Sequence, residues 1–292
     1  MLKRVDRVQI AVANCNAAEE VVEEVFGGEL VRRDKAATLC ARRSTMQAGS
    51  SLIELLEPDG AGPVQEFVSK WGSGLFGAGF SVDDPDAAAH HLTKTGVNFE
   101  QSAGQLFLDS GATFGMRTVI SQHHERAPVG AIKWAYEVTN LVADWQAASD
   151  RYARIFGLDA AKFSPIESKQ FGYTGTLTLF DPPARLDRIE IAQITDANLA
   201  MGRFHQRRGD SLYMFFVETD DVGALEQRLQ ARGARFATHR KDEAGLAELF
   251  IHPSAFLGVL VGVSRTEHAW TWSGDPARAK RAAHERAIKH GT

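Results

Sequence analysis

Histidine is the side chain best suited to both metal binding and acid–base chemistry near neutral pH, and this chain contains ten of them. Four stand in adjacent pairs, which lack the i, i+4 spacing that places two imidazoles on one helix face around a metal ion. These four, expected on the surface, are His90, His91, His123 and His124. His252 precedes Pro253 at a strand end, where we expect a turn, although its ring could donate a hydrogen bond to a substrate.

A cluster of positive charge surrounds His205. Arg203, Arg207 and Arg208 flank this histidine closely in sequence. Such a cluster commonly forms a solvated face, and it could also attract a carboxylate or a phosphate group.

The elements that carry these side chains form a repeat. Two segments match each other at a constant shift of 137 residues. The matching positions are Gly72, Phe80, Asp83, Asp84, Gly96 and Phe99, which recur as Gly209, Val217, Asp220, Asp221, Gly233 and Phe236. In each segment a strand leads to an Asp-Asp turn, whose carboxylate is expected to cap a helix over residues 87–95 or 222–232. Further strands end at residues 117–121 and 259–263.

Two other segments precede these and also resemble each other. Hydrophobic periodicity predicts, in the first, a strand over residues 5–12, a helix over 17–26 and a strand over 51–56. The other has the same order, with a strand over 132–138, a helix over 145–156 and a strand over 189–194. The chain therefore contains four units, joined in the middle by a polar linker over residues 123–130.

Three stretches of the sequence resemble a known family. IELLEPDGAGPVQEFVSKWGSGLFGAGFSVDD, residues 53–84, resembles the middle of methylmalonyl-CoA epimerases and of the wider vicinal-oxygen-chelate superfamily of glyoxalases, bleomycin-resistance proteins and extradiol dioxygenases. LFIHPSAFLGVLVGV, residues 249–263, resembles the closing strands, and FHQRRGDSLYMFFVETDD repeats the middle motif. The resemblance implies an α+β fold of four βαβββ modules that form two cup-shaped mixed sheets. It predicts an N-terminal domain over residues 1–126, a C-terminal domain over 127–267 and a basic tail over 268–292.

In that superfamily a divalent metal at the base of the cup binds two vicinal oxygens of the substrate and can stabilise an enolate. The resemblance places the usual ligand positions of the first cup at Arg7, Glu54, Gly77 and Val119. It places those of the second cup at Lys133, Glu190, Met214 and Gly262, with Tyr213 beside Met214 as another inward residue. One carboxylate without imidazole partners is a poor site for a transition metal. We therefore expect no bound cofactor, and we keep the binding of a divalent metal as an alternative.

In both cups the first ligand position holds a cation. We therefore expect two ion pairs where the metal would lie, Arg7 with Glu54 and Lys133 with Glu190. Each pair could simply neutralise a buried carboxylate. Alternatively, the cation stabilises an enolate while the glutamate acts as the base, and on this hypothesis these four residues are catalytic.

Other residues are candidates for binding the substrate. Gln9 shares the strand face of Arg7 by alternation, and Tyr136 lies on the equivalent strand of the second half, with Glu137 expected on the opposite face. The full set of predicted substrate-binding residues is Gln9, Tyr136, Tyr213, Met214 and His252.

Three functions are consistent with this sequence. The first is an isomerase or lyase that removes a proton beside the carbonyl of an organic acid or acyl compound. The second is a non-catalytic protein that sequesters a small molecule in an apolar cup. The third is a metal-dependent dioxygenase, which the cation and Met214 at ligand positions disfavour.

Composition limits the partners. A formal charge of -4 gives no basic field for nucleic acid, and no apolar run is long enough for a membrane span. The first residues alternate like a strand and lack a cleavage site, while Cys15 and Cys40 are too few for a disulfide framework. We expect a cytoplasmic protein with a small-molecule ligand, and a homodimer through exposed module edges is also plausible.

Overall fold

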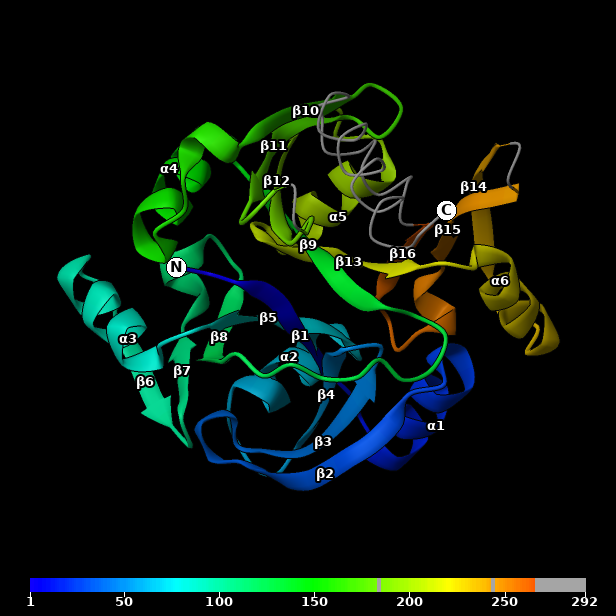
Figure 1. Ribbon diagram of the computed structural model, residues 1–292, viewed down its shortest axis with the longest axis horizontal. Coiled ribbons are helices and arrows are strands. Elements are labelled where there is room, and N and C mark those ends of the chain that lie inside the picture. Colours follow the sequence, from blue (N-terminus) through cyan, green and yellow to red (C-terminus); the bar gives the residue numbers. More distant parts are fainter. Residues whose placement is uncertain (183–184, 243–244, 266–292) are drawn as a thin grey trace, which may run out of the picture.

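The computed structural model describes residues 1–182, 185–242 and 245–265 (Figure 1). The basic tail expected over residues 268–292 lies outside these ranges.

The first half of the chain forms one curled, eight-stranded mixed sheet. Its strand order is β2-β3-β4-β1-β5-β8-β7-β6, with β1 parallel to β4 and antiparallel to β5. The strands are β1 (Arg4–Ala11), β2 (Glu29–Ala36), β3 (Ala41–Ala48), β4 (Ser51–Pro58), β5 (Gly74–Val82), β6 (Phe99–Ser102), β7 (Gln105–Leu108) and β8 (Arg117–Gln122). The helices are α1 (Cys15–Phe26), α2 (Pro63–Trp71) and α3 (Pro85–Lys94).

The second half repeats this sheet. Its order is β10-β11-β12-β9-β13-β16-β15-β14, which is the same arrangement eight strands later. The strands are β9 (Trp134–Val142), β10 (Ser164–Ser168), β11 (Tyr173–Leu179), β12 (Arg188–Ile194), β13 (Ser211–Thr219), β14 (Phe236–Asp242), β15 (Gly245–Ile251) and β16 (Leu260–Arg265). The helices are α4 (Trp145–Phe156), α5 (Ala200–Arg208) and α6 (Val222–Ala231). The α+β fold with four modules and two cup-shaped mixed sheets is confirmed.

Aspartate side chains cap the repeated helices, as the Asp-Asp pairs predict. Asp84 accepts hydrogen bonds from the backbone of the first turn of α3, and Asp221 does the same for α6. The helices α1 and α4 end at Gly27 and Gly157, which both adopt the left-handed conformation that favours glycine. The helix over 145–156 has the predicted bounds. The short helices α2 and α5, which join the modules within each half, were not predicted.

The two halves share one hydrophobic core. The central strands of the two sheets contact each other, β1 with β9 and β5 with β13. Helices from different halves pair beside these strands, α1 with α6 and α3 with α4, as Figure 1 shows. Aromatic side chains cross the boundary, for example Phe80 against Phe156 and Phe26 against Phe256. The backs of the sheets are therefore buried together, while separate apolar clusters lie in each concave face.

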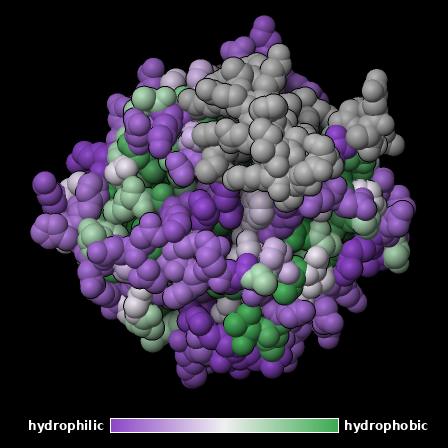
Figure 2. All heavy atoms as spheres, viewed as in Figure 1, coloured by the Kyte–Doolittle hydropathy of each residue, from purple (hydrophilic) through white to green (hydrophobic). Residues whose placement is uncertain are grey.

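The surface seen in this orientation is mostly hydrophilic, with a small apolar patch over β2 near its lower edge (Figure 2). Leu30 and Val31 of β2 are the exposed large apolar residues among those that the structure describes. The strand β2 lies at one edge of the first sheet.

Candidate functional site

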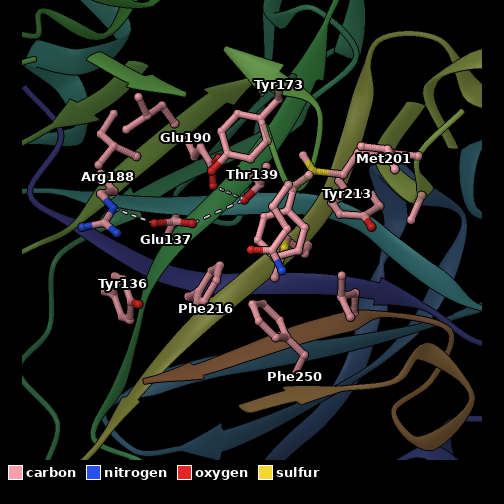
Figure 3. Close-up of a pocket in the computed structure, with 18 residues that line it drawn as sticks. Tyr136, Glu137, Thr139, Tyr173, Arg188, Glu190, Met201, Tyr213, Phe216 and Phe250 are labelled. Atoms are coloured by element: carbon pink, nitrogen blue, oxygen red, sulfur yellow. Dashed lines mark hydrogen bonds and ion pairs between the residues drawn. The ribbon is translucent and has the colours of Figure 1, made fainter. Parts of the chain in front are cut away.

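The concave face of the second sheet contains a cavity of about 280 Å³ (Figure 3). Most of its wall is apolar. The aromatic residues that line it are Tyr136, Phe171, Tyr173, Tyr213, Phe216 and Phe250. The charged residue types that line it are Glu137, Arg188 and Glu190, which come from the two adjacent strands β9 and β12. A cavity with an apolar wall and a few convergent polar groups is the usual form of a small-molecule site.

Two buried carboxyl groups lie at one end of this cavity. Thr139 Oγ1 lies 2.8 Å from Glu190 Oε2 and 3.4 Å from Glu137 Oε1, so this hydroxyl bridges the two carboxyl groups. The register of β9 and β12 explains the bridge, because Glu190 pairs directly with Thr139 and Arg188 pairs with Glu137. Arg188 Nε donates to Glu137 Oε2 over 2.6 Å, as Figure 3 shows.

Burial affects the protonation of the carboxyl groups in this cluster. Burial and the adjacent carboxyl of Glu137 raise the pKa of Glu190 well above its ordinary value near 4.5. Arg188 is the counter-ion of Glu137, and both side chains are about 2% exposed. Burial therefore favours the protonated form of Glu190 beside the ion pair of Arg188 and Glu137. Burial, with a smaller contribution from Glu190, also raises the pKa of Tyr173, which keeps its hydroxyl protonated.

Arg188 has one hydrogen-bond donor that is not used. Its Nη1 atom is buried and has no hydrogen-bond partner within the described part of the chain. A buried guanidinium N–H without an acceptor is costly, and a ligand oxygen would satisfy it.

Two β-bulges shape the lining of the cavity. The register between β9 and β13 shifts at Val217 and again near Tyr213, which inserts one extra residue on each strand. As a result, Tyr136 lines the cavity beside Glu137, and Tyr213 lines it beside Met214. The expectation that Glu137 faces away from Tyr136 is wrong, because strict strand alternation does not hold across a bulge.

Lys133 does not pair with Glu190, so this expectation is also wrong. The Lys133 ammonium lies 2.9 Å from Asp220 and 3.9 Å from Glu218, and its side chain is 29% exposed. The first strand of this half begins at Trp134, so Lys133 precedes it. Because α1 begins at Cys15 and α4 at Trp145, the two units are offset by 130 residues, and the equivalent of Arg7 is Glu137.

In the first cup, Arg7 and Glu54 form the expected ion pair. Arg7 Nη1 donates to Glu54 Oε1 over 2.7 Å, and Gln9 Nε2 donates to Glu54 Oε2 over 2.8 Å. Arg43, which was not predicted, lies 3.4 Å from Glu54. Burial alone would raise the pKa of Glu54, but the charges of Arg7 and Arg43 outweigh it and hold this pKa below its ordinary value. Both oxygens of Glu54 are thus occupied by donors.

A second cavity, of about 440 Å³, opens at the mouth of the first cup. Gln9, Phe76 and Arg117 line this cavity, whereas Arg7 and Glu54 do not. The ion pair of the first cup therefore lies beneath the cavity rather than in its wall.

His252 lies in a turn, away from both cavities. Its Nδ1 accepts from the backbone N–H of Ser254 at the start of a short 3-10 turn. It does not line the cavity of the second cup that contains Tyr136, Tyr213 and Met214.

Arg188 and Thr139 are the main residues of the site that the sequence analysis missed. Arg188 lies two positions before Glu190 in the strand RIEIAQI, so alternation places both on one face. This spacing was available in the sequence. Thr139 lacked a signal of its own, because its role depends on the pairing of β9 with β12.

The side chains in the second cup do not fit the divalent metal that the superfamily implies. No group of three or more histidine, cysteine, aspartate and glutamate side chains converges anywhere in residues 1–182, 185–242 and 245–265. The positions equivalent to usual ligands hold Glu137, Glu190, Met214 and Gly262, and Glu137 is already bonded to Arg188. A carboxyl whose neutral form is favoured by burial and a carboxylate paired with a guanidinium make a poor cation site.

Comparison with known proteins agrees with this fold. The family model for the Glyoxalase/Bleomycin resistance protein/Dioxygenase superfamily matches residues 4–121. The first half of the chain therefore matches that superfamily, and the second half repeats the same strand order. No curated protein matches the chain significantly.

Solved structures also resemble it. A mutant of 4-hydroxymandelate synthase from Streptomyces coelicolor is 12% identical over 91% of this chain and 93% of its own, with a TM-score of 0.72. Methylmalonyl-CoA epimerase from Mycobacterium tuberculosis is 23% identical over 46% of this chain and 89% of its own, with a TM-score of 0.40. Similarity at this level of identity shows the fold alone. Among the described residues, none of the helices has the length and apolar character of a membrane span.

Proposed function

We propose that the second cup binds a small carbonyl compound, an acyl compound or an organic acid, and moves a proton on the carbon beside its carbonyl. The observation that carries this proposal is the buried carboxyl pair of Glu137 and Glu190, bridged by Thr139 at one end of an otherwise apolar cavity. Titratable pairs whose environments separate their protonation states are typical of acid–base sites.

The proposed chemistry uses one proton on this pair, held by Glu190, whose neutral form burial favours. The ionised carboxylate accepts the proton from carbon, so a C–H bond breaks and an O–H bond forms. The electron pair moves into the carbonyl and generates an enolate, whose oxygen accepts hydrogen bonds from the protonated carboxyl and from Arg188 Nη1. Return of the proton to carbon completes an isomerisation, and loss of a leaving group from the neighbouring carbon completes an elimination.

Thr139 connects the two carboxyl groups during this cycle. Its hydroxyl donates to Glu190 Oε2 over 2.8 Å and lies 3.4 Å from Glu137 Oε1, so it contacts both groups between which a proton would move.

Exchange of hydrogen for deuterium beside the carbonyl tests this function before the natural substrate is known. Carbonyl compounds are incubated with the protein in D₂O, and loss of the proton signal is followed by NMR. We expect catalysed exchange with the native chain and a decrease of at least about 100-fold in Glu190→Gln and in Glu137→Gln, since acid–base groups typically contribute that much. Glu167→Gln, which alters an exposed glutamate on β10, is the matched control.

The same assay decides which cup is used. Glu54→Gln changes the equivalent residue of the first cup and should leave exchange intact at a temperature where this variant is folded. Exchange that persists in Glu190→Gln and Glu137→Gln but disappears in Glu54→Gln would refute the proposal.

A non-catalytic binding protein is the second candidate. The mainly aromatic wall of the cavity favours it, because such a wall binds apolar ligands without any reaction. Tight binding of a ligand with no exchange or conversion would support this function instead. The metal-dependent dioxygenase has no matching donor set within the described residues.

A further inference from the structure

We propose that the second cup selects an uncharged carbonyl compound with an apolar body of about one ring, and discriminates against carboxylates of the same size. This inference names the substrate class of the site proposed above and rests on that site. It depends on the charges at the end of the cavity, on one unsatisfied donor and on the shape of the wall.

The charges of the lining already balance. Among the described residues that line the cavity, Arg188 is the one cationic side chain, and its Nε is bonded to Glu137 over 2.6 Å. Burial beside Glu137 favours the neutral form of Glu190. A ligand carboxylate would be a second anion next to Glu137, within a low-dielectric cavity and with no cation left for it.

The donors, in contrast, are not all used. Arg188 Nη1 is buried with no acceptor among the described residues, and burial favours the protonated form of Glu190, which can donate. Arg188 and Glu190 are two positions apart on β12 and line the same cavity, so they present donors on one strand face. A neutral carbonyl oxygen has two lone pairs and no net charge, which matches this arrangement.

The wall defines the rest of the ligand. Phe216 and Phe250 meet edge to face with ring centroids 5.7 Å apart, and Figure 3 shows Phe216 between Glu137 and Phe250. Met214 and Tyr213 continue the apolar surface. A cavity of about 280 Å³ with this lining accommodates a body about the size of one ring and offers little polar contact for a second charged group.

Calorimetric titration of the full chain with three compounds tests the inference. Phenylacetone is a neutral ketone with a ring, phenylacetate is a carboxylate of similar size, and acetone lacks the ring. At pH 7.5 we expect phenylacetone to bind at least tenfold more tightly than each of the others. Its binding enthalpy should not depend on the ionisation enthalpy of the buffer, because no proton is taken up.

Two outcomes overturn the inference. Phenylacetate that binds as tightly as phenylacetone, with or without proton uptake, shows that the site accepts an anion. Acetone that binds as tightly as phenylacetone shows that the wall does not contribute.

Two variants test whether phenylacetone binds in the second cup. Arg188→Met combined with Glu137→Met removes the buried charge pair as a unit, which avoids leaving one charge alone and keeps the fold measurable. We expect this variant to lose at least tenfold in affinity for phenylacetone. Arg117→Met is the matched control, because Arg117 lines the cavity of the first cup over the ring of Phe76. Loss of affinity in the control with full affinity in the double variant would also overturn the inference.

Binding and exchange separate this inference from the proposed function. Phenylacetone that binds as expected without exchanging its protons leaves the ligand class intact and refutes the catalytic role of the carboxyl pair. Exchange that proceeds with carboxylates and not with ketones supports the catalytic role and refutes the ligand class.

Discussion

Glu54 and Glu190 occupy equivalent positions in the two halves and have opposite electrostatic surroundings. Glu54 pairs across the strands with Gln9 and receives donors from Arg7 and Arg43. Glu190 pairs with Thr139 and lies beside a second carboxyl, Glu137. The surroundings therefore favour the ionised form of Glu54 and the neutral form of Glu190, although the backbone around them is the same.

Glu190→Gln should stabilise the protein at neutral pH. Above about pH 4.5 the unfolded chain gains stability by ionising Glu190, whereas the folded chain keeps it protonated because its pKa is raised. The native protein therefore loses stability relative to the variant as pH rises towards the pKa of the folded state. We expect similar unfolding free energies at pH 4.5 and an advantage of at least about 1 kcal/mol for the variant at pH 7.5, measured by urea denaturation. Glu167→Gln should show no such trend. If the unfolding free energy of the native protein instead increased relative to that of Glu190→Gln with rising pH, the raised pKa of Glu190 would be contradicted.

Glu54→Gln should do the reverse. Its carboxylate has a lowered pKa, so it contributes stability above about pH 4.5 that is lost as pH falls through the pKa of the folded state. Removing it leaves Arg7 and Arg43 without their shared buried partner, which typically costs about 3–5 kcal/mol. We expect a loss of that order at pH 7 by urea denaturation, shrinking at pH 3. Equal stability of native and variant protein at pH 7 would show that the ion pair is not needed for folding.

Gly262→Ala should disturb the cavity of the second cup. An added Cβ at this position would lie 2.1 Å from the ring of Phe216, so the ring must move. Overpacking of this kind costs about 1–3 kcal/mol, and the displaced ring would fill part of the cavity. Thermal unfolding and ligand titration should both show a loss. Gly111→Ala, with no atom within 4 Å of the new Cβ, is the control and should change neither.

Thr139→Val should raise the pH at which Glu190 loses its proton. The Thr139 hydroxyl donates to the ionised carboxylate and so lowers the pKa of Glu190, and valine keeps the shape without the donor. The infrared C=O stretch of the protonated carboxyl, assigned with Glu190→Gln, reports this titration. Thr139→Ser, which retains a hydroxyl, should titrate like the native protein. An unchanged midpoint in Thr139→Val would show that the hydroxyl does not couple the pair.

The sequence was sufficient to predict the architecture, because the repeat is carried by glycines and capping aspartates whose roles are local. Asp84 and Asp221 do cap their helices, and the helix over 145–156 lies where its periodicity predicts. Strand register was harder. Ile132 precedes the strand and is itself apolar, so the hydrophobic pattern does not show that the strand begins at Trp134.

The site was predicted only in part. Arg7 and Glu54 were paired correctly, from the ligand positions that the family resemblance implied. The error at Lys133 came from the slipped register, which hid Glu137 as the equivalent of Arg7. Bulges explain the remaining difference, because an extra residue beside Glu137 changes which side chains enter the cup and leaves no mark in composition.

The core that the backs of the two sheets share makes each half depend on the other for folding. Strands β1 and β9 contact each other, and Asp187 accepts a hydrogen bond from the backbone of Val5 across the boundary, over 2.7 Å. A half produced alone would expose this apolar surface to water. Cleavage within the linker over 123–130 should accordingly give two fragments that recover the native structure when mixed, so that this duplicated chain behaves as a covalently joined heterodimer.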